Sequence, residues 1–298
     1  MAPKKRSKRR KLLFVDTNIW LDFYRARQEA GLKLLEKTEA VAGHLIVSYQ
    51  LESEFKKNRQ AAILEGMQEL KAPSQIARPG LLSDAKAAKV MNQSLKEAEK
   101  RVRSLKSKLA RVIANPAVHD PVYKTCQRIF HKDDAITLTR EDKNRQGIRR
   151  RAMRRFLHGC PPRKRTDTSL GDAFNWEWII QCAKDQNADV LIVSRDSDYG
   201  ITFDDKSYIN DHLKQEFSER VSRKAKVILF GRLSEALRQF DVELSKQVVD
   251  AEAEVAAAAK DSSGTSLLDR AKDVEKALAE IERQFSPRAK NLFKLTVE

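Results

Sequence analysis

Four short apolar runs along the chain predict buried strands, since a strand covered on both faces reads as about four to eight consecutive apolar residues. These runs are residues 12–15, 44–47, 188–194 and 226–230. Between the runs, apolar residues recur at the three- and four-residue steps of a helix. Strands that alternate with helices in this way predict an α/β fold with a parallel sheet.

The helical pattern also predicts where individual helices begin and end. One helix is expected from Thr17 to about Thr38, with Gly31 as an interruption. Ser48 is expected to cap a second helix, whose apolar face includes Leu51 and Phe55. Later helices of the core are expected at 208–220 and at 233–249.

Residues 60–165 do not continue the alternation of strand and helix. Proline and glycine indicate a loop at 72–83, and a long polar helix is expected at 84–114. Its apolar residues form a narrow seam, which predicts packing against another helix of this chain or of a partner. The seam consists of Val102, Leu105, Leu109 and Val112. With further helices expected at 121–131 and 140–156, this region reads as a helical insertion.

Acidic residues stand where the predicted strands end and where the helices begin. Asp16 ends the first apolar run, Asp196 and Asp198 follow the run at 188–194, and Asp172 opens a helix after Gly171. The carboxyl ends of parallel strands share one edge of a sheet, and ligands bind at that edge. The simpler alternative for Asp16 and Asp172 is that each only stabilises the N-terminus of a helix.

A fourth acidic position lies in the helix after Ser48. Glu52 and Glu54 are two residues apart, which places them about 200° apart around a helix, so at most one of them can face Asp16. The alternative for either glutamate is an exposed position on the helix surface. Oxygen-only ligands at such a site would favour Mg²⁺ or Mn²⁺ over zinc, and no histidine lies in these four stretches apart from His44 at the start of one strand.

Positive charge is concentrated in two segments of the chain, whose formal net charge is +16. Residues 1–11 carry seven Lys or Arg and no acid, and residues 140–165 carry eleven Lys or Arg against two acids. Such concentration suits a polyanionic partner such as nucleic acid, although a basic helix can also be merely solvated. The candidate phosphate-binding residues are Arg150, Arg151, Arg154, Arg155, Arg163, Lys164 and Arg165.

Several classes of protein are disfavoured by what the sequence lacks. Its three cysteines form no C-x-x-C pair, so neither a disulfide framework nor a zinc ribbon is indicated. No signal-peptide core and no apolar run of about 20 residues is present, so we expect a soluble, cytoplasmic protein. Neither G-x-x-x-x-G-K-[ST] nor G-x-G-x-x-G occurs, which disfavours a nucleotide-binding enzyme. A phosphotransferase that uses Asp16 as nucleophile would be expected to carry aspartate where Asn18 stands.

The four acidic stretches resemble, in order, the acidic motifs of the PIN-domain nucleases. They read KLLFVDTNIW, HLIVSYQLESEF, SLGDAFNWEWII and ADVLIVSRDSDYG. The Pro161-Pro162 pair, the basic residues after it and Gly171-Asp172 are similar to a larger bacterial subgroup with a helical insertion before the third motif. The resemblance covers about residues 11–240. It implies a three-layer α/β/α fold with a central parallel sheet.

The resemblance also implies a domain organisation and a site. Residues 1–10 would be a basic disordered arm, 11–240 the nuclease domain with its insertion at about 60–165, and 241–298 a helical extension, amphipathic at 265–285. The family's acid just before a hydrophobic residue corresponds to Glu54 rather than Glu52. The implied catalytic and metal-binding residues are Asp16, Glu54, Asp172 and Asp196. Asp198 would be an additional ligand, and the supporting residues would be Thr17, Asn18, Ser194 and Asn175.

These observations lead to one principal expectation about function. A PIN-like domain with all four acids filled is expected to hydrolyse phosphodiester bonds with Mg²⁺ or Mn²⁺, on RNA rather than DNA, as a toxin or a defence effector. The alternatives are a DNase of the same fold and an inactive PIN scaffold that only binds nucleic acid. The seam in 84–114 and the amphipathic segment 265–285 are expected to serve a homo-oligomer or a helical protein partner.

Overall fold

The computed structural model describes residues 9–71, 81, 85–162 and 169–262. The chain divides into two compact units. The first comprises residues 1–59 and 122–259, and the second comprises residues 60–121 and 260–298. The segments 1–8 and 265–285, for which an arm and an amphipathic helix are expected, lie outside the described residues.

A parallel sheet of five strands forms the centre of the first unit, in the order β3-β2-β1-β4-β7. The central strand β1 pairs with β2 through Leu13 and Leu45, and with β4 through Leu13 and Leu191. Its residues Leu12 to Val15 are fully buried, as a strand covered on both faces requires. The strands are β1 (Lys11–Val15), β2 (Leu45–Ser48), β3 (Thr137–Leu138), β4 (Asp189–Val193) and β7 (Val227–Phe230).

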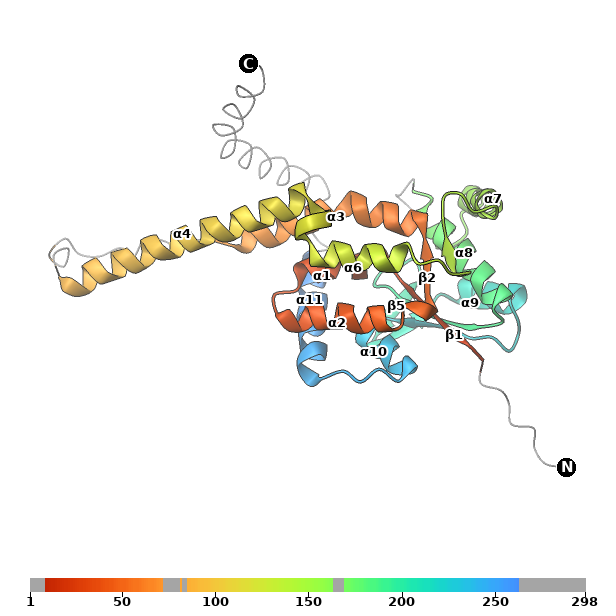
Figure 1. Cartoon of the computed structure of the whole chain (residues 1–298). Coiled ribbons are helices and arrows are strands. Elements are labelled where there is room, and N and C mark those ends of the chain that lie inside the picture. The colour runs from red at the N-terminus through yellow and green to blue at the C-terminus, as the bar shows by residue number, and fades with distance from the viewer. Residues whose placement is uncertain (1–8, 72–80, 82–84, 163–168, 263–298) are drawn as a thin grey trace, which may run out of the picture. The chain divides into compact units, whose positions relative to one another are not determined.

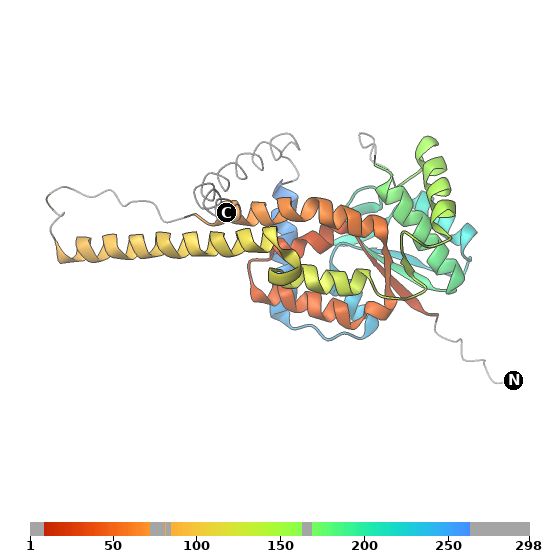
Figure 2. The same cartoon turned by 45° about the horizontal axis from the view of Figure 1, so that its top comes forward.

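Helices cover both faces of this sheet, which confirms the expected α/β/α arrangement (Figure 1). One side carries α1 (Thr17–Arg25), α2 (Glu29–Ala40), the one-turn η1 (Ala42–His44) and α6 (Pro121–Phe130). The other side carries α7 (Arg145–Leu157), α8 (Gly171–Asp185) and α9 (Asp211–Arg220), with α7 beside α8 (Figure 2). After β7 come α10 (Leu233–Leu237), η3 (Arg238–Phe240) and α11 (Lys246–Ser262).

The expected helix over residues 17–38 is two helices, and Gly31 is not where it breaks. The break lies at residues 26–28, and Gly31 is buried inside α2. A Cβ atom at Gly31 would lie 2.6 Å from the Cβ of Ala26. The glycine therefore allows the two helices to approach closely at their junction.

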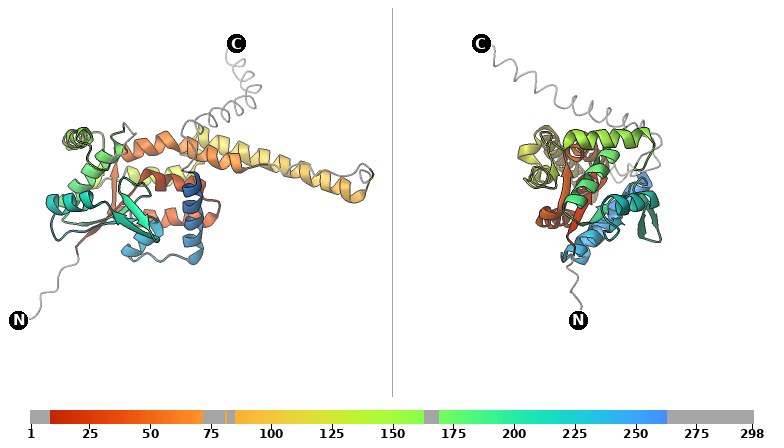
Figure 3. Two further views of the ribbon diagram at one scale, coloured as in Figure 1. Left: turned by 180° about the vertical axis from the view of Figure 1, so that it is seen from behind. Right: turned by 90° about the vertical axis from the view of Figure 1, so that its right-hand side faces the viewer.

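Two further helix predictions were wrong in their bounds. The helix expected over 208–220 begins at Asp211, with the Asn210 side chain accepting a hydrogen bond from the His212 amide. Before it lies an antiparallel hairpin of β5 (Gly200–Phe203) and β6 (Lys206–Ile209), turquoise in Figure 3. The helix expected over 233–249 ends near Asp241, whose φ of 59° is left-handed, and α11 is a separate helix.

The described residues of the second unit are mostly helical. It contains the part of α3 (Tyr49–Glu69) from Gln60 onward, α4 (Lys86–Ala114) and α5 (Pro116–His119). The long helix expected at 84–114 is thus confirmed to within two residues, and Leu105 of its seam is 45% exposed. Across the described residues, no helix combines the length and apolar character that a membrane crossing needs.

Candidate metal centre

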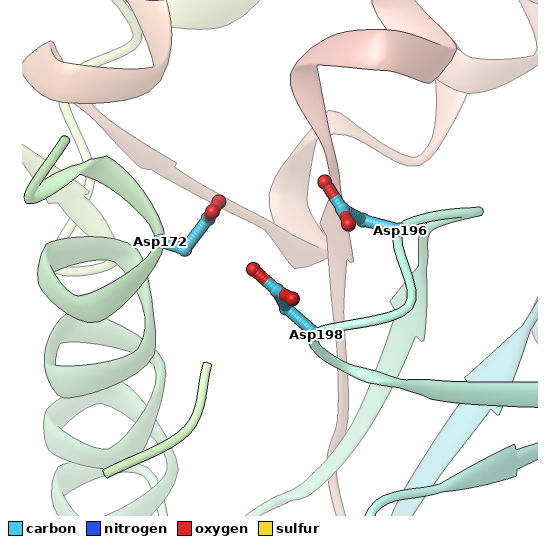
Figure 4. Close-up of side chains that lie close together, drawn as sticks. All are labelled: Asp172, Asp196 and Asp198. Atoms are coloured by element: carbon cyan, nitrogen blue, oxygen red, sulfur yellow. The ribbon is translucent and has the colours of Figure 1, made fainter. Parts of the chain in front are cut away.

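Three aspartates from two elements meet beyond the carboxyl ends of the strands. Asp172 lies in the first turn of α8, while Asp196 and Asp198 lie in the loop after β4. One carboxylate oxygen from each lies within 4.8 Å of those of the other two (Figure 4). All three side chains are half-buried. Asp198, expected only as an additional ligand, is therefore part of the tightest acidic cluster among the described residues.

The backbone around β4 explains why this loop presents its carboxylates to the cluster. The Ser194 hydroxyl accepts a hydrogen bond from the Asp196 amide at 3.0 Å and donates one to Asp16 Oδ2 at 2.6 Å. Ser194 itself continues the sheet, because its amide donates to the carbonyl of Phe230. A single buried hydroxyl thus connects the end of β4 to the end of β1.

Asp16 is buried at the end of β1 and caps α1. Its carboxylate accepts hydrogen bonds from the Thr17 amide at 2.7 Å and from the Ser194 hydroxyl. Burial raises the pKa of Asp16 to about 6, with the charges of Asp196 and Glu54 adding to the shift and the two hydrogen bonds opposing it. The carboxylate therefore does cap the helix, as the simpler alternative supposed, but it also lies in the electric field of the acidic residues.

Glu54, and not Glu52, lies beside Asp16. The Glu54 carboxylate accepts hydrogen bonds from the Thr17 hydroxyl at 3.1 Å and from Gln50 Nε2 at 2.9 Å. It also lies against α8, since a Cβ atom at Gly171 would be 1.8 Å from Glu54 Oε1. Glu52 faces away and is bound by Lys56 and His131.

The two asparagines expected to support the site have different surroundings. Asn175 is fully buried and accepts a hydrogen bond from the Ser48 hydroxyl at 2.7 Å, which links α8 to the end of β2. Ser48 also accepts the Leu51 amide and so caps α3, as expected. The side-chain oxygen of Asn18 is buried and has no hydrogen-bond partner among the described residues.

Tyr199 is a residue of this site that the sequence reasoning did not single out. Its side chain is fully buried, and its hydroxyl has no hydrogen-bond partner among the described residues. Burial raises its pKa well above the usual value, and the charges of the acidic residues add to that shift. These residues are Asp172, Asp16, Glu54 and Asp196. The available signal in the sequence was an aromatic residue directly after Asp198, in the stretch ADVLIVSRDSDYG.

The expected phosphate-binding arginines of α7 fall into two groups. Arg150 and Arg154 are exposed. Arg155 is buried in ion pairs with Glu177 of α8 and Glu216 of α9, so its guanidinium is not presented to a ligand. Arg151 is 39% exposed and also pairs with Glu177. Residues 163–165 lie outside the described part of the chain.

The donor set of the cluster suits a hard divalent cation. It offers only carboxylate oxygens, which Mg²⁺, Mn²⁺ and Ca²⁺ prefer. Burial penalises the charge of a carboxylate, and carboxylates close together repel one another. Both effects raise the pKa of Asp16. A cation bound among the carboxylates would offset both effects. The residues present therefore fit a metal ion.

Comparison with curated proteins and with solved structures found no match. Comparison with models of protein families did find one, and it agrees with the architecture described above. A model of the PIN domain matches residues 13–199, which is more than half of the chain and spans Asp16, Glu54, Asp172, Asp196 and Asp198. The chain therefore belongs to the PIN-domain family, whose fold is that of nucleases.

Proposed function

We propose that the protein is a metal-dependent nuclease that hydrolyses phosphodiester bonds, with RNA as its preferred substrate. The observation that carries the proposal is the convergence of Asp172, Asp196 and Asp198 within 4.8 Å, beside the buried Asp16. A carboxylate cluster of this density at the edge of a PIN fold has a use in binding cations and little use in stabilising the chain.

Each residue of the cluster has a role in this proposal. Asp172, Asp196 and Asp198 would hold Mg²⁺ or Mn²⁺, with Asp16 and Glu54 completing the negative field around it. A divalent ion at such a site activates water and stabilises the charge that develops on the phosphate. Ser194 and Thr17 hold the carboxylates of Asp16 and Glu54 in place through their hydroxyls. Arg150 and Arg154 are exposed on α7 and would attract the phosphate backbone.

A cleavage assay with the purified full-length chain tests the proposal. Labelled RNA and DNA of one sequence are incubated with Mg²⁺, with Mn²⁺ or with EDTA. We expect cleavage of RNA with either ion and none with EDTA. The Asp172→Asn, Asp198→Asn double variant should not cleave, whereas Asp133→Asn, an exposed acid in the loop before β3, should cleave normally.

The second candidate is a PIN scaffold that binds nucleic acid without cutting it. The exposed arginines of α7 favour binding on their own, whether or not the cluster is active. Binding of RNA by a wild-type chain that leaves the RNA intact at saturating Mn²⁺ would select this candidate.

For the active enzyme, we further propose a cytoplasmic toxin or defence role. Growth arrest on expression of the wild type, but not of Asp16→Asn, tests that role.

A further inference from the structure

The hairpin of β5 and β6 begins two residues after Asp198 and has two different faces. On its inner face, a Cβ atom at Gly200 would lie 2.8 Å from Leu229 Cδ2 of β7, and one at Gly231 would lie 3.1 Å from Ser207 Oγ. The hairpin is therefore pressed against the end of the sheet. Side chains point alternately to the two faces of a strand. Gly200 and Ser207 face the sheet, so the residues of the pairs Ile201–Tyr208 and Phe203–Lys206 point away from it.

The outer face of the hairpin is apolar, aromatic and exposed. Ile201 is 66% exposed, Phe203 is 72% exposed and Tyr208 is 50% exposed. Ile201 pairs directly with Tyr208, and Phe203 pairs with Lys206, so these four side chains form one continuous surface. Burying large apolar side chains is favourable, and no described residue of the first unit covers these, so the surface suits a ligand with flat apolar faces.

We propose that this outer face is a stacking surface for unpaired bases of the strand that reaches the acidic site. The proposal rests on the proposed function and adds a binding surface outside the acidic cluster. Bases stack on aromatic side chains whatever their sequence, and Lys206 supplies a cation for the neighbouring phosphate. Bases in a duplex are stacked on one another and are not available for such contacts.

Chain connectivity ties this surface to the cluster. Ile201 follows Asp198 by three residues and Phe203 follows it by five. At up to about 3.6 Å per residue, these residues lie within about 11 and 18 Å of Asp198. A strand whose phosphate reaches the cluster can therefore place a nearby base on the hairpin.

The size of the surface favours this occupant over a protein. Three large side chains bury on the order of 600 Å² at most, at roughly 200 Å² each, whereas each partner of a stable complex contributes about 800 Å². The turn carries Asp204 and Asp205, both at positive φ. Their charges repel phosphate, so a base on Phe203 is expected to have its phosphate on the Lys206 side, away from the two aspartates.

Binding without cleavage tests the proposal on the full-length chain. Fluorescence anisotropy in EDTA compares a short single-stranded RNA with the same strand in a duplex. Replacing both rings, by Phe203→Leu with Tyr208→Leu, removes stacking but keeps the surface apolar. We expect the affinity for the single strand to fall at least about tenfold while duplex binding is unchanged. The matched variant Phe203→Tyr with Tyr208→Phe keeps both rings and should bind like the wild type.

Three results would overturn the proposal. One is an equal affinity of the leucine variant and the wild type for the single strand. Another is a wild type that binds the duplex as tightly as the single strand. The third is a change of oligomeric state in the leucine variant by sedimentation, which would make the face an interface between copies. Manganese-dependent cleavage, measured separately, reports on the proposed function, so the two can fail independently.

Discussion

Burial and neighbouring charges make the ionised form of Asp16 costly in the folded chain. Its pKa of about 6 exceeds the usual 3.8 because the carboxyl is buried, and because Asp196 and Glu54 are close. Between these two values the folded chain holds a proton that the unfolded chain has lost. The free energy of unfolding therefore falls as the pH rises from about 4 to 7, by about 3 kcal/mol in total.

Replacing Asp16 by Asn should remove this pH-dependent loss. The amide oxygen can still accept the Thr17 amide, and the amide group can donate to the Ser194 hydroxyl. In EDTA the variant should match the wild type near pH 4 and exceed its free energy of unfolding at pH 7.5 by up to about 3 kcal/mol. Urea unfolding at both pH values measures the difference. A gain of equal size at both values would show that charge is not its cause.

A divalent ion should stabilise the wild-type chain through the other aspartates. At a free concentration about 100 times its Kd, Mn²⁺ should add about 2.7 kcal/mol and raise Tm by about 5 to 10 °C. The Asp172→Asn, Asp198→Asn variant should lose most of this shift, and the Asp133→Asn control should keep it. Differential scanning fluorimetry over a range of Mn²⁺ concentrations checks both, and an unshifted wild type would argue against a metal at the cluster.

The positions of the acidic residues could be predicted because they depend on local rules. A carboxylate after a parallel strand, or in the first turn of the helix that follows, lies at one edge of the sheet whatever the rest of the chain does. The burial of Arg155 could not be predicted, since its partners Glu177 and Glu216 are 22 and 61 residues away. Tyr199 was missed for a similar reason, because only the assembled sheet surrounds its hydroxyl with charges.

At the level of elements, a buried ion network holds three helices together. Arg155 of α7 and Arg220 of α9 both bind Glu177 of α8, and both also bind Glu216. Burial acts to raise the pKa of Glu177, but the hydrogen bonds and charges of Arg220 and Arg155 hold it below the usual value. Glu216 also accepts the indole N–H of Trp176 at 2.9 Å. The network thus fixes α8, whose first turn carries Asp172.

Breaking this network should destabilise the fold without a direct effect on phosphate binding. Arg155→Met keeps the aliphatic part of the side chain and leaves the buried Glu177 and the half-buried Glu216 with one cation fewer, at a cost of about 3 kcal/mol. Its neighbour Arg154 is exposed, and Arg154→Met should change stability by less than about 0.5 kcal/mol. Urea unfolding separates the two. Equal stability of both variants would contradict a structural role for Arg155.

The start of α8 depends on a close approach that only glycine permits. Gly171→Ala would place a methyl group against the Glu54 carboxylate, which is the movable end of a flexible side chain. The fold should therefore survive, and cleavage should fall about 10- to 100-fold as Glu54 is displaced. Gly43→Ala is the control, because its Cβ meets nothing within 4 Å. Thermal unfolding and cleavage rates together check this, and normal cleavage by Gly171→Ala would show that cleavage does not depend on the position of Glu54.

The elements that sequence reasoning missed share a physical cause. The hairpin at 200–209 carries its apolar residues on the exposed face, so the usual link between apolar residues and the core misleads there. β3 has only two residues and is recognised by its pairing with β2 rather than by any pattern of its own. The turn at Asp204 and Asp205 was the local signal for the hairpin, since aspartate tolerates positive φ.

For the whole molecule, the question is where the excess of positive charge meets the substrate. Described residues of α7 offer Arg150 and Arg154 as exposed cations, with Arg151 partly exposed beside them. The other basic segment, residues 1–11, is described only from Arg9 onward. Both segments are dense enough in charge to bind phosphates, and counterion release distinguishes them because each lost phosphate contact lowers the salt dependence of binding.

Replacing Arg150, Arg151 and Arg154 together by Gln should therefore flatten the slope of log K against log salt by up to about 2 to 3, at roughly 0.7 to 0.9 per lost contact. Preference among sequences should barely change, because phosphate contacts position the strand and do not read bases. Arg101, Arg103 and Arg111 are exposed on α4, and their replacement by Gln removes the same charge as a control. Anisotropy titrations in EDTA at several salt concentrations give the slopes. If both variants and the wild type have the same slope, the phosphates do not run along α7, and the basic segment 1–11 becomes the expected path. Deletion of residues 1–8 would then test that path.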